Sequence, residues 1–323
     1  MVQILGIGFV AGLAAALLFG SATSGTAISI PLFYLASLPI AVAALGWSHA
    51  AGLVAALVAA GAIAAMFGGF YFVSFLVGVG LPAWWLGYLG LLARPVDHAP
   101  DGLEWYPVGR IVAWAAILGP AVVLIAIPYY GFDADSFRTG LRTAFERFLR
   151  AQLQLGADAP LRLPGGSDPA RTLDVLVAIF PPMAAVLATL TSLVNLWLAG
   201  RIVKLSGRLK RPWPELPAMV FPAFAPMLLA GAVAATFLPG AVGILASALM
   251  ASLLMAYVVL GFAVLHAITR ELRERPLILG GVYATAALFG WTLLIVALLG
   301  LAEAIFAVRA RVARRRGLPM RPE

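Results

Sequence analysis

Cysteine is absent from this chain of 323 residues, and only 11% of the residues are charged. The absence of cysteine excludes a disulfide framework and a thiolate metal site. Soluble domains carry charge on roughly a quarter of their residues, so this chain has too few charges to cover a surface in water. Histidine is scarce too, with three scattered residues. We therefore expect neither a metal site nor a cofactor.

Catalytic motifs are missing as well. The sequence has no glycine-rich phosphate loop ending in Lys-Ser or Lys-Thr, no His-Glu-x-x-His, and no paired carboxylates on one apolar segment. We do not expect an enzyme, and a membrane enzyme is the weakest alternative. The net charge of +8 falls mainly in loops beside apolar segments, where cytoplasmic Lys and Arg collect. It therefore indicates membrane orientation, and we expect no nucleic-acid partner.

Hydrophobic residues make up 63% of the chain. A helix that crosses a membrane needs about 20 mostly apolar residues, because its backbone hydrogen bonds must close inside the segment. Nine segments meet this rule: residues 4–20, 27–45, 50–67, 70–93, 108–130, 173–202, 218–237, 241–268 and 277–308. The predicted fold class is all-α, a polytopic transmembrane helix bundle of about 8–10 spans in a bacterial inner (cytoplasmic) membrane. We expect a single transmembrane domain over residues 1–308 and a basic cytoplasmic tail over residues 309–323.

A polar insertion over residues 131–171 interrupts the apolar segments. Phe137, Leu141 and Phe145 recur at helical spacing, with arginines on the opposite side, so we expect an amphipathic helix near residues 137–155. Asp135 or Ser136 would cap its first turn. The favoured interpretation is a helix in the headgroup plane. The alternative is a soluble hairpin packed on the bundle.

Orientation gives one clear prediction and one conflict. The loop over residues 201–211 carries five basic residues, so the end of the sixth segment should be cytoplasmic. The basic tail should be cytoplasmic too. Three predicted crossings, however, lie between the basic loop and the tail, and an odd number of crossings would place the tail on the outer side of the membrane. The last segment, at about 32 residues, is too long for one straight span, so we expect it to break or re-enter. The alternative is that the tail is no orientation signal.

Small residues follow one face of the first helix at close-packing spacing. They are Gly8, Ala11, Gly12, Ala15 and Ala16. Small side chains let a second helix approach closely in a membrane. The interpretations are internal packing of the bundle or a docking face for a partner subunit.

Two polar residues inside apolar segments are candidate ligand-binding residues, because such groups are costly in a membrane. Asn195 lies with Thr189, Thr191 and Ser192 nearby, and its alternative role is an interhelical hydrogen bond. Glu303 either faces a polar cavity or extends toward the interface beside Arg309. Several prolines in or near the spans predict broken helices, which weakly favours a binding cavity.

Three short motifs resemble the YybS-like family of bacterial membrane proteins, a domain of unknown function. The first is the stretch Ile30–Ile40, with Pro31 and Pro39, followed by Gly46-Trp47. The second is Asn195 with Arg201, Lys204 and Pro212. The third is Gly300–Glu303 with Arg309, where the family more often has Asp at the acidic position.

That family is distantly similar to the substrate-binding S-components of energy-coupling factor transporters and to the rod-shape protein MreD. The resemblance implies that the small residues of the first helix dock a coupling subunit. It also implies that the loop after that helix, with Thr23, Ser24 and Thr26, lies near a small ligand. S-components have about six helices, fewer than expected here.

The leading functional prediction is a small-molecule binding or translocating membrane subunit, with its ATPase on another chain. The alternative is an MreD-like scaffold for envelope or cell-shape machinery, which binds no ligand. The first predicts a closed cavity lined by polar side chains at broken helices, and the second predicts a filled bundle.

Overall fold

The computed structural model describes residues 1–97, 102–156, 161 and 168–316. Helices dominate these residues, and the strands among them are β1 (Ala93–Pro95) and β2 (Leu103–Trp105), paired antiparallel as a short hairpin. Seven helical segments of the described chain are long and apolar enough to cross a membrane. The prediction of an all-α polytopic bundle is therefore confirmed.

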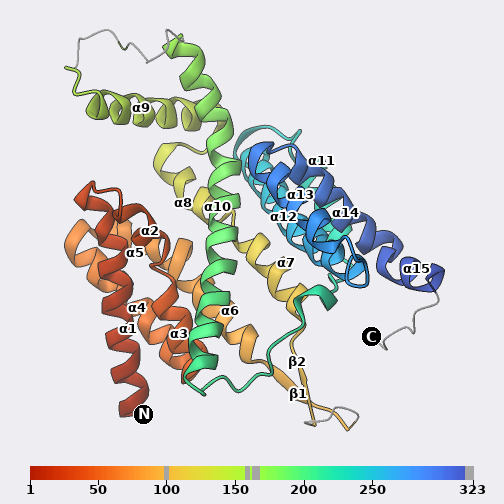
Figure 1. The fold of residues 1–323 in the computed structure, drawn as a ribbon. Helices are drawn as coiled ribbons and strands as arrows, with labels where there is room; N and C mark the ends of the chain where they lie inside the picture. Colours follow the sequence, from red (N-terminus) through yellow and green to blue (C-terminus); the bar gives the residue numbers. More distant parts are fainter. Residues whose placement is uncertain (98–101, 157–160, 162–167, 317–323) are drawn as a thin grey trace.

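The N-terminal helices form the first lobe of the bundle (Figure 1). It contains α1 (Val2–Gly20), α2 (Ser29–Tyr34), α3 (Leu38–Gly46), α4 (His49–Phe67), α5 (Gly69–Phe75), a π-helical turn (Leu76–Gly80) and α6 (Leu81–Leu91). Alanines such as Ala15, Ala55 and Ala59 are fully buried in its core. Lipid gives no hydrophobic drive for helix association, so close packing of small residues stabilises the lobe.

The second lobe is formed by the C-terminal helices. They are α11 (Ala225–Ala235), α12 (Gly240–Ile268), α13 (Arg275–Leu288), α14 (Thr292–Phe306) and α15 (Val308–Arg315). Its central helix is α12, in which Tyr257 and Leu260 are fully buried. Gly261 and Gly300 let α12 and α14 touch, because a Cβ atom on either glycine would overlap a backbone carbonyl of the other helix.

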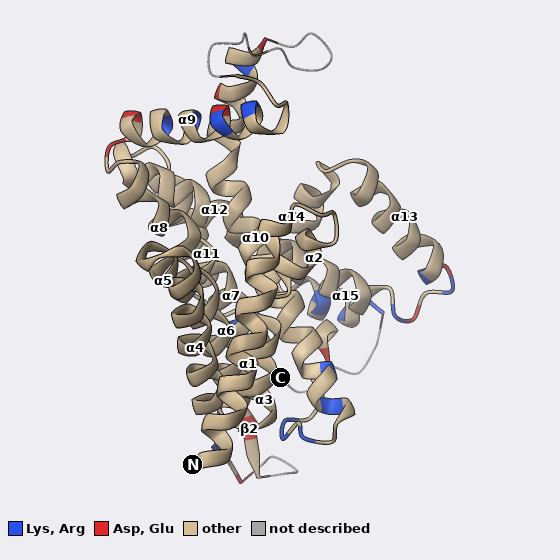
Figure 2. Cartoon of the chain, turned by 90° about the vertical axis from the view of Figure 1, so that its left-hand side faces the viewer, with Lys and Arg blue, Asp and Glu red and all other residues tan. Residues whose placement is uncertain are grey.

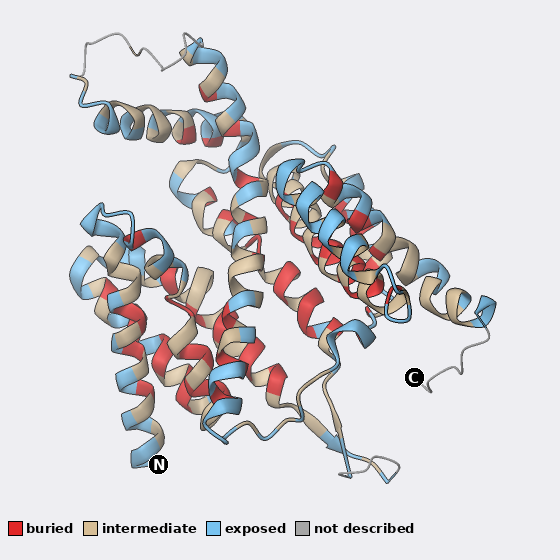
Figure 3. Ribbon diagram, viewed as in Figure 1, coloured by how far each residue is buried: buried red, intermediate tan, exposed pale blue. Residues whose placement is uncertain are grey.

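Three helices join the two lobes. They are α7 (Val108–Leu118), α8 (Ala121–Tyr130) and α10 (Pro169–Leu205). On one side α10 packs Ala199 and Val203 against Ala41 and Leu45 of α3. Figure 1 shows α10 running between the lobes, and Figure 3 shows that buried residues gather where the helices face one another.

The polar insertion forms α9 (Ala134–Gln152), which lies across one end of the bundle (Figure 1). Its apolar side buries Phe137 and Leu141 against Ile127 and Val177. The predicted cap was wrong: Asp133 caps the helix by accepting a hydrogen bond of 2.8 Å from the Ser136 amide. Hydrogen bonds from Ser136 lower the pKa of Asp133. The insertion residues 157–160 and 162–167 lie outside the described chain.

The last apolar segment is broken into two helices, α13 and α14. After α12 ends at Ile268, α13 leaves that end of the bundle and α14 returns to it. The return is shown by Arg316, which donates to the Ile268 carbonyl over 2.8 Å, and by Arg309, which donates to Pro217, six residues after the basic loop. The described part of the tail and the basic loop therefore lie at one end of the molecule, which we call the basic end.

Charge divides unevenly between the two ends. Figure 2 shows charged residues on α9, on the loops and on α15, while most of the helix length between them carries none. Residues 131–174, around α9, carry six basic and six acidic side chains, so the other 16 basic and eight acidic residues hold the whole net charge of +8. Residues 317–323 of the tail lie outside the described chain.

Candidate functional site

The small-residue face of α1 is covered by α4 of the same chain. A Cβ atom on Gly8 would lie 2.7 Å from Val54 Cβ, and one on Gly12 would lie 2.7 Å from the Ala55 carbonyl oxygen. Ala15 and Ala16 are buried as well, and Ala11 is partly buried. The face that the resemblance assigns to a coupling subunit is thus occupied by internal packing.

The hydroxyl groups after α1 make local hydrogen bonds in an exposed turn. Thr23 donates to the Gly20 carbonyl over 2.8 Å, and the hydroxyls of Ser24 and Thr26 lie 3.1 Å apart. All three residues are exposed, in the turn between α1 and α2. They lie together, as the sequence suggested, but away from Asn195 and Glu303, whose contacts involve other parts of the chain.

Asn195 closes the break between α2 and α3. Pro39 has no amide hydrogen, so the Leu35 carbonyl takes its hydrogen bond from Leu38 instead, over 2.9 Å. This leaves the Tyr34 carbonyl without its helical donor. The Asn195 side-chain amide donates to it over 2.7 Å, and also to the Ser37 hydroxyl over 2.6 Å. Asn195 is 2% exposed, so its amide serves an interhelical contact.

A second break, between α7 and α8, is closed in the same way. Pro120 cannot donate to the Ala116 carbonyl, and the hydroxyl of Ser252 on α12 donates to that carbonyl over 2.8 Å. Thr189 of α10 contacts the neighbouring Ala115 carbonyl over 3.4 Å. Sequence analysis missed Ser252, because a single serine in an apolar helix carries no local signal of its partner.

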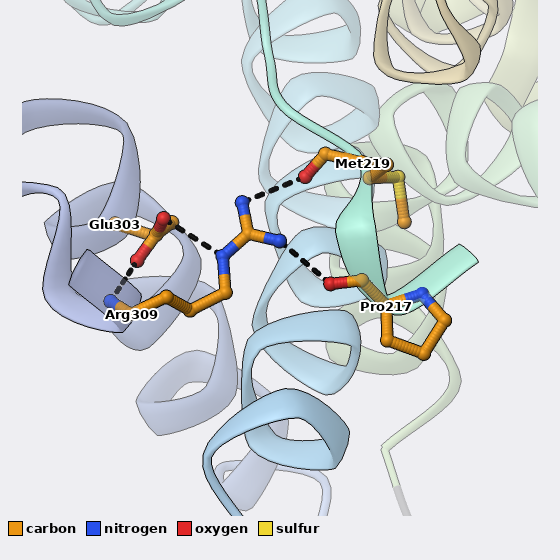
Figure 4. A network of polar contacts seen from close by, with 4 residues as sticks. All are labelled: Pro217, Met219, Glu303 and Arg309. Carbon is orange, nitrogen blue, oxygen red and sulfur yellow. Dashed lines mark hydrogen bonds and ion pairs between the residues drawn. The ribbon is translucent and has the colours of Figure 1, made fainter. Parts of the chain in front are cut away.

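Glu303 forms a clamp at the basic end (Figure 4). Its carboxylate accepts hydrogen bonds of 2.8 Å from both the backbone amide and the side chain of Arg309. The same guanidinium donates to the carbonyls of Pro217 and Met219 over 2.6 and 2.8 Å. Ala307 stands between α14 and α15 with φ of 48°, and the two helices meet at 79°. The ion pair therefore holds α15 against the segment Pro217–Met219, which follows the basic loop.

An apolar groove of about 560 Å³ lies between the π-helical turn and α6 on one side and α7–α8 on the other, with Leu245 of α12 at its edge. It is lined almost entirely by hydrocarbon and aromatic groups, chiefly Leu81, Trp85, Trp114 and Leu124. Trp85 and Trp114 meet edge to face with ring centroids 5.5 Å apart, and both line the groove. The groove is open along much of its surface and is not an enclosed cavity. Sequence analysis did not predict it, because the groove depends on how distant helices pack.

Few polar groups accompany the groove. The indole nitrogens of Trp84 and Trp85 are buried in its wall without a hydrogen-bond partner in the described chain. Arg110 lies one helical turn before Trp114 on the same face of α7, toward the basic end, and its guanidinium lies 6.0 Å from the ring centre of Tyr106. Arg110 is exposed, so the nearest turn of α7 beyond the groove-lining Trp114 carries a cation.

Comparisons with family models, with curated proteins and with solved structures found no match to this chain. The resemblance to the YybS-like family therefore stays a prediction from short motifs, and the functional argument depends on the geometry alone.

Proposed function

We propose that this protein is a membrane-embedded subunit that binds, and with a partner translocates, an amphiphilic small molecule. The observation that supports this proposal is the apolar groove between α6, with the π-helical turn before it, and α7–α8. Its hydrocarbon lining suits an acyl or isoprenoid chain, because burial of such a chain needs no polar partner. The proposed substrate class differs from the vitamin-like ligand that the resemblance implies, because the groove has almost no polar lining.

Arg110 indicates the charge that the head group of the proposed ligand should carry. An exposed cation one helical turn beyond the groove-lining Trp114 favours an amphiphile whose head is anionic. The basic end of the molecule is the cytoplasmic end in this proposal, since Lys and Arg accumulate on that side of a bacterial inner membrane. The head of the ligand would then be bound at the cytoplasmic leaflet.

In this proposal the ATPase is on a partner chain, because the sequence contains no phosphate loop. The partner would not dock on the small-residue face of α1, which α4 already covers. The outward side of α13 is available instead: none of the residues of α13 is buried, and Tyr283 stacks on Phe262 of α12 on its inner side.

Lipid analysis of the purified protein tests the proposal. The protein is extracted in mild detergent, and native mass spectrometry measures the amphiphiles that stay bound. Ala121 lines the groove, so Ala121→Phe would fill it. Ala287→Phe adds the same group on the exposed side of α13 and is the matched control. We expect the wild type and the control to retain a stoichiometric amphiphile and Ala121→Phe to lose it. Equal retention by the two variants, or none by the wild type, would contradict the proposal.

A scaffold for envelope or cell-shape machinery is the second candidate. The closed helix breaks favour it, because Asn195 and Ser252 satisfy carbonyls that a transporter could leave open for a ligand. Co-purification of envelope-building proteins with a wild type that carries no amphiphile would support the scaffold.

A further inference from the structure

Cations and indole rings form a cluster where α10 reaches the basic end, which we call the α10 platform. It consists of Arg201, Lys204 and Arg208 with Trp47, Trp197 and Trp213. Arg201 and Lys204 both lie over the ring of Trp213, at 5.4 and 5.1 Å from its centre. Arg201 also lies 5.9 Å from the ring centre of Trp197, and Arg208 lies 4.8 Å from that of Trp47.

The platform holds positive charge without a counter-charge. No carboxylate of the described chain lies within ion-pair distance of Arg201, Lys204 or Arg208. Two of these cations share one indole ring, so they repel each other in a confined space. The rings are attracted to the cations and restrict their positions, while the N–H groups of these exposed side chains stay free to donate. An anion that bridges Arg201 and Lys204 would relieve the repulsion.

An exposed apolar face on α10 leads directly to the platform. Met183, Leu187 and Val194 are 45%, 40% and 52% exposed, and Trp197 continues their line. These positions are spaced by three, four or seven residues up to Arg201 and Lys204, so they share one side of the helix. Figure 3 shows exposed segments recurring along α10. In a bilayer, hydrocarbon chains would cover this face and the cations would stand at headgroup level.

We infer that the α10 platform binds the phosphate headgroup of an anionic phospholipid, whose acyl chains lie along the exposed face of α10. The continuous apolar face favours a lipid over a soluble phosphate compound, because a soluble anion would leave that face without a role. The site is separate from the proposed ligand groove, which lies between α6, with the π-helical turn before it, and α7–α8. The inference therefore stands even if the proposed function fails.

Lipid competition in mixed micelles tests the inference. Native mass spectrometry compares binding of phosphatidylglycerol with binding of phosphatidylcholine to the full-length protein. We expect Arg201→Gln/Lys204→Gln to lower the preference for phosphatidylglycerol by about thirtyfold, since each basic residue near an anionic surface contributes about fivefold. The matched control is Arg311→Gln/Arg315→Gln on α15, which removes the same charge from the same end and should preserve the preference.

A third variant distinguishes the effect of the arrangement of cations and rings in the α10 platform from the effect of net charge. Trp213→Leu keeps every cation but removes the shared ring, and it should also weaken the preference. An equal effect of the α10 and α15 double variants would overturn the inference, because net charge alone would then explain binding. Displacement of the lipid by millimolar inorganic phosphate would also overturn it, in favour of a soluble anion. Thermal unfolding of each variant verifies that the exposed substitutions leave the protein folded.

Discussion

Ser252 should stabilise the protein mainly because Pro120 breaks the helix opposite it, although its hydroxyl also lies 3.0 Å from the Leu249 carbonyl of its own helix. The Ser252 hydroxyl lies 2.8 Å from the Ala116 carbonyl, which has lost its helical donor to the proline ring. In Ser252→Ala that carbonyl stays buried without a donor. A hydrogen bond between membrane helices contributes about 0.6 kcal/mol on average, and an unsatisfied buried acceptor costs about 1–3 kcal/mol. We expect Ser252→Ala to lower the free energy of unfolding by about 1–2 kcal/mol.

Replacing the proline should remove most of that cost. The backbone at Gly119 and Pro120 is already in the right-handed helical region, with φ of −51° and −62°. An alanine at position 120 would therefore direct its amide toward the Ala116 carbonyl and supply the missing hydrogen bond. In a Pro120→Ala background we expect Ser252→Ala to cost only about 0.5 kcal/mol, a coupling energy of about 1 kcal/mol.

A double-mutant cycle measures this coupling. Unfolding of the two single variants and the double variant is followed in mixed micelles of rising denaturing detergent. Ser247→Ala is the control, because the Ser247 hydroxyl bonds only the Ile244 carbonyl of its own helix, over 2.7 Å. The reasoning is refuted if Ser252→Ala costs no more than Ser247→Ala, or if its cost is the same with and without Pro120.

Two further predictions concern the basic end. Glu303→Gln should release α15 and lower the free energy of unfolding by about 2 kcal/mol, because Arg309 loses its charge partner and the two side chains are only 17% and 10% exposed. Faster hydrogen exchange over residues 308–316 would show the release. The control is Glu104→Gln, which removes an exposed ion pair with Arg94 and should change the free energy of unfolding by less than about 0.5 kcal/mol. Single cysteines in this cysteine-free chain test the orientation: Ser206→Cys and Arg314→Cys should react with a membrane-impermeant maleimide only from the cytoplasmic face, and Thr143→Cys only from the other. A reaction of all three from one face would contradict the arrangement of the two ends.

The membrane helices were predictable because their requirement is local. About 20 apolar residues in a row suffice to indicate a span, and most predicted segments agree with the structure to within a few residues. The division of the last segment into α13 and α14 was visible only as an excess of length. Small residues on α1 predicted a close contact with another helix, but the same spacing would allow packing against α4 of this chain or against a helix of a partner subunit. Which helix fills the face is a property of the fold, so sequence spacing could not decide it.

The positions of the prolines were a poor guide to function. A proline in a span frees a carbonyl, and the sequence suggested that such groups would line a binding cavity. In the structure a donor from a distant helix reaches two of these carbonyls, Asn195 at the α2–α3 break and Ser252 at the α7–α8 break. The breaks therefore join helices to one another. The groove instead lies beside the edge-to-face contact of Trp85 with Trp114, and its lining is almost entirely apolar. For this reason the chemistry of a ligand here should be that of a hydrocarbon chain.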